Sequence, residues 1–125
     1  MSDPKFVHLR LHSEYSITDG IVRLDAAVRQ AIEDGMPALA ITDLGNLFGM
    51  VKFYTAARGA GLKPVIGCDV WISSPPTASA PNTREEDQRV LLLAKNRQGY
   101  LRLCELLSAA YLGERRQGRA RICRD

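Results

Sequence analysis

The sequence predicts an α/β fold with mostly parallel strands. Short apolar segments alternate with longer segments of helical periodicity along the 125 residues, and Gly and Asn residues mark many of the junctions. A helix must carry the chain back across the sheet between two parallel strands. The alternation therefore predicts about four strands and three helices, arranged as an α/β domain.

The first half of the chain predicts two strand and helix units. Residues 5–13, "KFVHLRLHS", alternate polar and apolar side chains as a strand does. A helix is predicted next, because apolar residues recur at helical spacing at Leu24, Ala27, Val28, Ala31 and Ile32. Gly35 is expected to end it. The apolar run 38–42, "ALAIT", is typical of a strand buried on both faces. A second helix is expected at about 47–60, with Asn46 as its N-cap.

The second half continues the alternation after one interruption. Residues 63–73, "KPVIGCDVWIS", predict a third strand. Residues 74–88 are rich in Pro, Ser, Ala and charge, which predicts a mobile surface loop that is a poor place for chemistry. Residues 89–96, "RVLLLAKN", predict a fourth strand. Residues 98–112 predict a helix with one apolar face, made of Tyr100, Leu103, Leu106, Leu107 and Ala110.

Composition excludes several classes of protein. A 46% hydrophobic content allows a packed core, and a net charge of +3 from 17 basic and 14 acidic residues is too balanced to indicate a nucleic-acid groove. No apolar run approaches the roughly 20 residues of a membrane span, and the first residues do not resemble a secretory signal. A cytoplasmic location without membrane contact is expected. Cys68, Cys104 and Cys123 form no CxxC pair, so neither a disulfide framework nor a structural zinc site is predicted.

The end of the chain, residues 114–125, carries five arginines and two acids. A nucleic-acid patch is one interpretation, and a solvated connector is the one that we favour. No closing strand or cap is evident there, so we expect the chain to be an incomplete domain.

Candidate site residues lie near the ends of the predicted strands, where sites form in α/β folds. His12, Asp43 and Asp69 are expected to converge there. In a regular strand Arg10 would face the same way as His12 and His8, so a permanent cation would stand among possible metal ligands.

We interpret His8 as an ordinary polar strand residue. Other candidates have simpler interpretations: turn and capping groups for Ser13, Tyr15 and Ser16, and packing residues for Phe48, Phe53, Tyr54 and Trp71.

The segments "FVHLRLHSEYSITDG", "GMPALAITDLGNLFG", "VKFY", "AGLKPVIGCDVWI" and "LLLAKNRQGYLRLCELLSAAYL" stand in a specific order. Because of these segments and their order, the chain resembles, over residues 1–125, the PHP (polymerase and histidinol phosphatase) domain family. The form it resembles is the one found at the N-terminus of bacterial replicative DNA polymerase III alpha subunits. The resemblance implies a distorted, seven-stranded β/α barrel, of which this chain would be the first half.

The metal motifs of the family are altered in this chain. Where the family has His-x-His, Thr-Asp-His-Gly and Gly-x-Glu, this sequence has Arg10 in place of the first histidine, Leu44 in place of a later one, and Asp69 in place of the glutamate. The resemblance assigns His12, Asp19 and Asp69 as remnants of the metal site. Leucine offers no donor atom, and a guanidinium repels a divalent cation, so we predict no intact metal site and no catalytic residue.

We expect Arg10 to occupy the space of the lost metal and to form ion pairs with some of Asp19, Asp43 and Asp69. The alternative is that Arg10 lies at a solvated strand end. The resemblance then implies a non-catalytic scaffold within a DNA-directed DNA polymerase that acts in chromosome replication.

The resemblance also implies partners. They are the epsilon proofreading exonuclease and other holoenzyme subunits, with DNA and magnesium bound by the polymerase outside this stretch and no cofactor bound within it. One alternative is an active metal-dependent phosphoesterase or 3′ to 5′ exonuclease. Another, a free-standing histidinol phosphatase relative, is weakened by the polymerase-like segment around 91–103.

Overall fold

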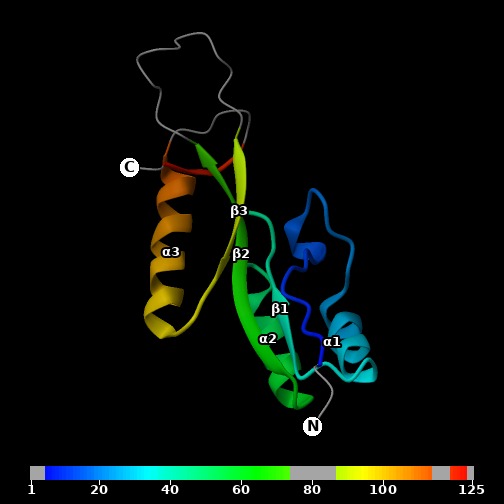
Figure 1. Cartoon of the computed structure of the whole chain (residues 1–125). Coiled ribbons are helices and arrows are strands. Elements are labelled where there is room, and N and C mark those ends of the chain that lie inside the picture. Colours follow the sequence, from blue (N-terminus) through cyan, green and yellow to red (C-terminus); the bar gives the residue numbers. More distant parts are fainter. Residues whose placement is uncertain (1–4, 74–86, 114–118, 124–125) are drawn as a thin grey trace.

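The computed structural model describes residues 5–73, 87–113 and 119–123. Within these ranges the chain forms three α-helices, four strands and one short 3-10 helix (Figure 1). In chain order they are η1 (Glu14–Ser16), α1 (Leu24–Glu33), β1 (Ala38–Ile41), α2 (Met50–Gly59), β2 (Lys63–Ser73), β3 (Gln88–Leu93), α3 (Arg97–Leu112) and β4 (Arg121–Cys123). The α/β class is confirmed.

Strand β2 is the centre of the sheet. β1 pairs in parallel with its first part, from Ala38 opposite Lys63, and β4 pairs in parallel with its last part. β3 pairs with β2 on the other side and runs antiparallel. Two of the three pairings are parallel, as predicted, and β3 differs because the sequence between it and β2 predicts a loop rather than the crossover helix that parallel pairing needs.

The predicted strand at residues 5–13 is not a regular strand. It runs beside β1, where the amide of Ala40 donates to the carbonyl of His8 (3.0 Å) and the amide of Thr42 donates to that of Leu11 (2.9 Å). The step from Ala40 to Thr42 is two residues, whereas the step from His8 to Leu11 is three, and this extra residue interrupts the ladder. In the described chain, the pairing of this segment with β1 is therefore a single isolated bridge, between His8 and Leu39.

Strand β4 lies inside residues 114–125, for which the sequence favours a solvated connector, and that prediction is wrong for residues 121–123. Three residues, one of them a charged arginine, give too short a pattern to be recognised as a strand. Of the predicted loop at 74–88, residues 74–86 lie outside the described chain, and Gln88 is already the first residue of β3.

Helix α2 begins at Met50, later than predicted, and Asn46 does not cap it. The side chain of Asn46 instead accepts a hydrogen bond from the Phe48 amide (3.1 Å) and donates one to the carbonyl of Tyr15 (2.9 Å), so it shapes the loop before the helix. Among the aromatic residues assigned to packing, Phe53 is fully buried, but Phe48 and Tyr54 are exposed.

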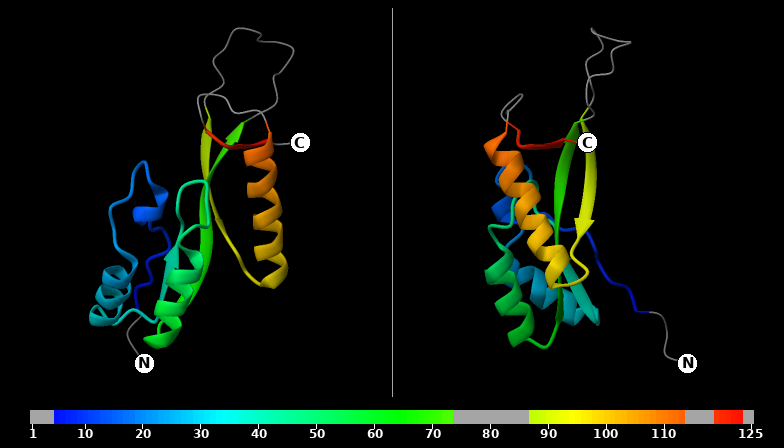
Figure 2. Two further views of the ribbon diagram at one scale, coloured as in Figure 1. Left: turned by 180° about the vertical axis from the view of Figure 1, so that it is seen from behind. Right: turned by 90° about the vertical axis from the view of Figure 1, so that its left-hand side faces the viewer.

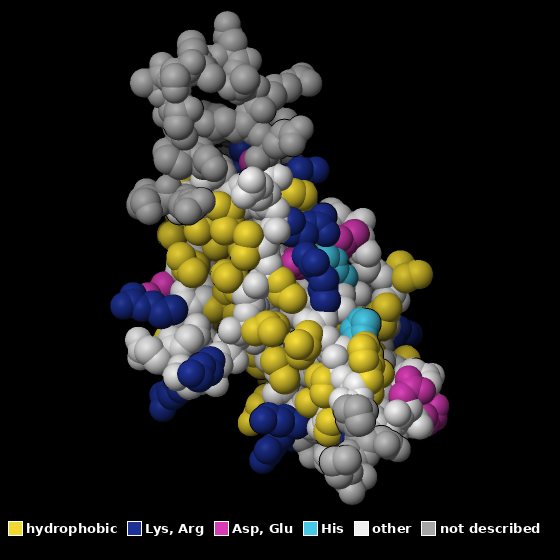
Figure 3. Space-filling view, viewed as in Figure 1, with side chains coloured by type: hydrophobic (Ala, Val, Ile, Leu, Met, Phe, Trp, Pro, Cys, Tyr) yellow, Lys and Arg dark blue, Asp and Glu magenta, His cyan; other side chains and the backbone are white. Residues whose placement is uncertain are grey.

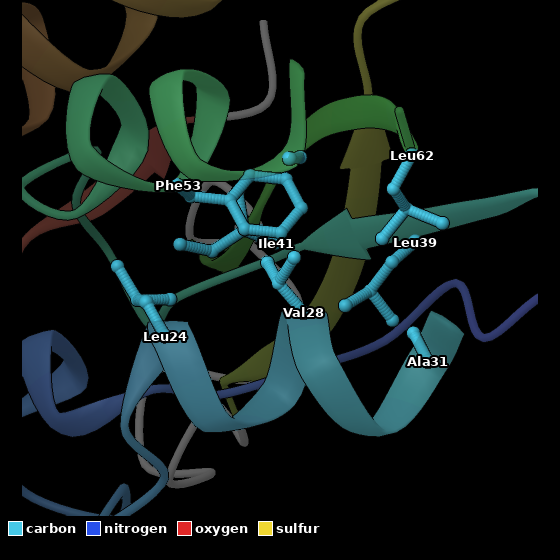
Figure 4. Close-up of a cluster of buried hydrophobic side chains, with 8 residues drawn as sticks. Leu24, Val28, Ala31, Leu39, Ile41, Phe53 and Leu62 are labelled. Carbon is cyan, nitrogen blue, oxygen red and sulfur yellow. The ribbon is translucent and has the colours of Figure 1, made fainter. Parts of the chain in front are cut away.

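The helices pack on one face of the sheet in two clusters. In the first cluster, Leu24 and Val28 from α1 and Phe53 from α2 point toward Ile41 of β1 (Figure 4). In the second, α3 packs Leu103 and Leu107 against Cys68 and Val70 of β2. Figure 2 shows α3 standing apart from α1 and α2, along the later part of β2.

The opposite face of β2, which the helices do not cover, carries Asp69 and Trp71. Ile66, Cys68 and Val70 alternate with Gly67, Asp69 and Trp71, so Asp69 and Trp71 point away from the face that the helices cover. Along the described residues, no helix is long and apolar enough to cross a lipid bilayer.

Candidate functional site

The site is built around Asp69 in the middle of β2, whose side chain is fully buried. The backbone of Asp69 is fixed through both its amide and its carbonyl: its amide donates to the carbonyl of Asp43 (3.1 Å), and its carbonyl accepts from the amide of Gly45 (2.7 Å). These bonds continue the pairing of β1 and β2 past the end of β1. The carboxylate of Asp69 is therefore held in one place by the sheet.

Arg10 binds Asp69 through two nitrogens of its guanidinium group. Its Nε donates to Oδ2 at 2.9 Å and its Nη2 donates to Oδ1 at 2.7 Å. The hydrogen bonds and the charge of Asp69 raise the pKa of Arg10 above its usual value. The Arg10 side chain is 53% exposed, so it covers the buried carboxylate from the solvent side. Arg10 thus forms a two-bond ion pair and does not merely lie at a solvated strand end.

His12 links Asp69 to a second carboxylate. Its Nε2 lies 2.5 Å from Oδ2 of Asp69, and its Nδ1 lies 2.8 Å from Oδ2 of Asp19. A row of contacting side chains therefore runs from Arg10 through Asp69 and His12 to Asp19.

Two opposing effects act on the pKa of Asp69. Burial, the largest, raises it, while hydrogen bonds and charge interactions from Arg10 and His12 lower it. The second group of effects prevails, and the pKa of Asp69 lies below its usual value. Asp69 is therefore ionised at neutral pH although it is buried.

Asp43 is not part of this row, which corrects the expectation that it is a possible partner of Arg10. Its buried carboxylate accepts hydrogen bonds from the Ser13 amide (2.6 Å), the Ser13 hydroxyl (2.9 Å) and the Ser16 hydroxyl (2.9 Å). Hydrogen-bond donors can stabilise a buried carboxylate as a cation does. Asp43 therefore anchors the turn around η1 to the end of β1, and no described cation forms an ion pair with it.

Leu44 and His8 take no part in this row of side chains either. Leu44 follows Asp43, and its backbone forms a bridge with Asp69 while its amide donates to the Ser16 hydroxyl (3.0 Å). The ring of His8 lies 5.9 Å from the ring of Phe6. The structure thus joins the side chains of Arg10, His12, Asp19 and Asp69. Asp43 and Leu44 contact Asp69 through their backbone only, and His8 is not part of the cluster.

The residues present do not fit a divalent metal ion. Both oxygens of Asp69 are bound by Arg10, and both ring nitrogens of His12 face carboxylates. Among residues 5–73, 87–113 and 119–123, no group of three or more His, Cys, Asp or Glu side chains is arranged to hold a metal. A cation at Asp69 would also lie beside a permanent guanidinium charge, which would repel it.

Sequence reasoning missed the contribution of Cys68. Its thiol lies 3.2 Å from the carbonyl of Asp43 and 3.5 Å from that of Asn46, on the helix-covered side of β2. Burial raises the pKa of the Cys68 thiol to about 12, so the group is a neutral donor to the loop that follows β1. The apolar alternation of β2 predicts that Cys68 is buried, but it carries no information about these carbonyl partners.

Comparison with known proteins gives the family. The profile of the PHP domain matches residues 8–125. The chain is 49% identical over 93% of its length to the DNA polymerase III subunit alpha of Neisseria meningitidis serogroup B, and 45% identical over 96% to that of Pseudomonas aeruginosa. It covers 10% of each of these proteins, so it spans about a tenth of the relatives that it matches, in their N-terminal region.

Two solved structures share the fold. An amidohydrolase from Chromobacterium violaceum aligns over 86% of this chain and 34% of its own, with a TM-score of 0.61 and 20% identity. A putative metal-dependent phosphoesterase from Bifidobacterium adolescentis aligns over 85% of this chain and 34% of its own, with a TM-score of 0.51 and 16% identity. On the strength of the profile match over residues 8–125, this chain belongs to the PHP domain family.

Proposed function

We propose that this chain is the PHP portion of a replicative DNA polymerase III alpha subunit and that it is a non-catalytic scaffold there. The support is its identity of 45% to 49% with alpha subunits of two bacterial species over more than nine tenths of its length. The intact protein would be a DNA-directed DNA polymerase of the bacterial cytoplasm, acting in chromosome replication. Magnesium for nucleotide addition would be held outside these residues.

The two-bond ion pair between Arg10 and Asp69 is the observation that carries the non-catalytic role. A PHP metal centre needs free imidazole nitrogens or carboxylate oxygens near the ion. Here the guanidinium takes both oxygens of Asp69, and the Leu44 side chain offers no donor. A buried carboxylate that loses its cation must find another, and Arg10 supplies one that is part of the chain.

The alternative function is that of a metal-dependent phosphoesterase or 3′ to 5′ exonuclease. Arg10 and Leu44 argue against it. The test is to incubate the purified chain with zinc or manganese, dialyse it, and measure bound metal by mass spectrometry. Turnover of a phosphate monoester and of a 3′-labelled oligonucleotide is then assayed. We expect neither bound metal nor turnover, and stoichiometric metal with turnover would overturn the proposal.

A ligand-restoring variant sharpens this test. Arg10→His, Leu44→His and Asp69→Glu together would return the family pattern, and this variant is expected to retain more metal than the unaltered chain. Arg102→His is the matched control, because Arg102 is an exposed residue of α3 whose partner is Glu105. An equal gain of metal in the control would show that an added surface histidine is sufficient and that Arg10 does not exclude metal.

A scaffold must bind partners, and we propose that this one contributes to binding the epsilon proofreading exonuclease and other subunits of the holoenzyme. The support is the similarity to alpha subunits alone. Isothermal titration of the chain with the purified epsilon subunit tests it. Saturable binding is expected, and an absence of binding both to this chain and to the full-length alpha subunit would contradict the proposal.

A further inference from the structure

Trp71 is in contact with two arginines on the same face of the sheet as Asp69. The guanidinium carbon of Arg89 lies 4.7 Å from the centre of the indole ring, and that of Arg119 lies 4.5 Å from it. Arg89 stands directly opposite Trp71 in the pairing of β2 and β3. The sequence predicts that Trp71 is a packing residue, and the groups that pack on it are the guanidinium groups of Arg89 and Arg119.

A buried ion pair holds this arrangement in place. Arg121, which pairs with Trp71 in register, binds Asp87 at 2.7 Å, with side chains 10% and 7% exposed. This contact joins β4 to the start of β3. Because Arg119 lies two residues before Arg121, the ion pair also holds the backbone near Arg119 close to the sheet.

The positive charges on this face are not all compensated. Asp69 and Asp87 are paired with Arg10 and Arg121. Within the described ranges, no carboxylate pairs with Arg89 or Arg119, and both residues are exposed. The ion pair uses Nε and Nη2 of Arg10, and Nη1 makes no hydrogen bond to the described residues.

These arginines are neighbours on the sheet. Asp69 and Trp71 are two positions apart on β2 and project from the same face, roughly 6 to 7 Å apart along the strand. Arg10 covers the first, and Arg89 and Arg119 cover the second. Figure 3 shows basic side chains gathered on this face of the molecule, next to histidine and acidic side chains.

We propose that Arg10, Arg89 and Arg119 form a binding site for a phosphate group. Guanidinium forks match phosphate oxygens, and stacking on an indole ring holds such forks in place while their N–H edges stay free to donate. The ring already contacts two guanidinium groups, so we expect the arginines, and not the ring, to contact the ligand, unlike in a base-stacking platform. This function goes beyond the scaffold role, and it needs neither a metal ion nor hydrolysis.

The single tryptophan of the chain gives a direct assay. The fluorescence of Trp71 is followed while inorganic phosphate or a single-stranded oligothymidylate is added, with sodium chloride kept constant. We expect a saturable change in emission. If three arginines contact the phosphates of the oligonucleotide, raising the salt from 50 to 200 mM should weaken binding roughly 15- to 20-fold, from the slope of about −0.7 per contact for single strands.

Matched variants test which arginines are responsible. Arg89→Gln with Arg119→Gln should weaken binding at least 10-fold and flatten the salt dependence. Arg58→Gln, at an exposed position in the last turn of α2, removes one charge outside the proposed site and should leave binding unchanged. Thermal melts of all variants establish that they are folded. If the double variant does not fold, each single variant is titrated by phosphorus NMR of the added phosphate, with a weaker affinity expected for each.

The two titrations distinguish the source of the phosphate. Saturation by inorganic phosphate, with no gain in affinity from the oligonucleotide, supports a site for a small phosphate ligand. A much higher, salt-dependent affinity for the oligonucleotide supports a site for the backbone of a nucleic acid. If neither ligand saturates, or if the variants at Arg89 and Arg119 bind as tightly as the unaltered chain, the proposal is overturned.

Discussion

Arg10 and Asp69 are 59 positions apart in the sequence, and their side chains are joined by two hydrogen bonds of 2.9 Å and 2.7 Å. The pair ties the N-terminal segment, which forms no regular strand, to the central strand of the sheet. It also takes both carboxylate oxygens that a metal ion in a PHP centre would require. The same contact thus contributes to the fold and removes a ligand.

The pH dependence of stability should report this contact. Because the folded-state pKa of Asp69 is below 3.8, the folded chain binds a proton at this site less readily than the unfolded chain. The contribution of Asp69 to the free energy of unfolding is therefore complete above about pH 5, and it is lost as the pH falls below 4 through the folded-state pKa. Urea unfolding at several pH values between 6 and 2.5 measures it.

Other carboxylates also titrate in this range, so the comparison is made with Asp69→Asn. The variant should be less stable than the unaltered chain at pH 6, and the difference should shrink as the pH falls below 4. A difference that stays constant down to pH 2.5 would show that the charge of Asp69 does not stabilise the fold.

Removing the carboxylate of Asp43 should loosen the turn around η1. Asp43→Ala leaves the Ser13 amide and two hydroxyls without their acceptor, and we expect a loss of about 2 to 4 kcal/mol in the free energy of unfolding. Asp43→Asn keeps one oxygen acceptor and should lose roughly half as much. Chemical denaturation gives the energies, and faster proteolysis within residues 13–22 is expected for the Ala variant. Equal losses for the two variants would mean that shape and not hydrogen bonding matters here.

Two glycine substitutions should have opposite effects. A Cβ at Gly20 would lie 1.9 Å from the carbonyl oxygen of Ser13, whereas one at Gly59, the last residue of α2, would meet no atom within 4 Å. Gly20→Ala should therefore destabilise the chain by about 1 to 3 kcal/mol or more. Gly59→Ala should stabilise it by roughly 0.5 to 1 kcal/mol. Thermal melts decide, and a neutral Gly20→Ala would show that the 13–22 segment can move away from this contact.

The cysteines should differ in reactivity. Cys68 is fully buried and its pKa is raised to about 12, whereas Cys123 is exposed. At pH 8, roughly one Cys68 thiol in ten thousand would be a thiolate, which is the form that reacts with alkylating reagents. Mass spectrometry after brief treatment with iodoacetamide should find Cys123 modified and Cys68 unmodified until urea is added. Equal labelling in the native state would contradict the burial of Cys68.

The sequence alone determined the class of the fold and the types of side chain that the site can use. Helical periodicity placed α1 and α3 closely, and the continuous apolar run located β1, because these patterns come from neighbours along the chain. Leu44 has no donor atom and Arg10 keeps its charge in any fold, so the loss of metal ligands could be read from residue types.

Only the tertiary structure decided which groups meet. Residue types allowed Arg10 to pair with Asp19, Asp43 or Asp69. The N-terminal segment runs beside β1 and brings Arg10 to Asp69, while Ser13 and Ser16 bind Asp43. The existence of β4 and the arginines on Trp71 also depend on contacts between distant segments. A local pattern specifies the period of a segment, but its partner is set by packing energy summed over the whole fold.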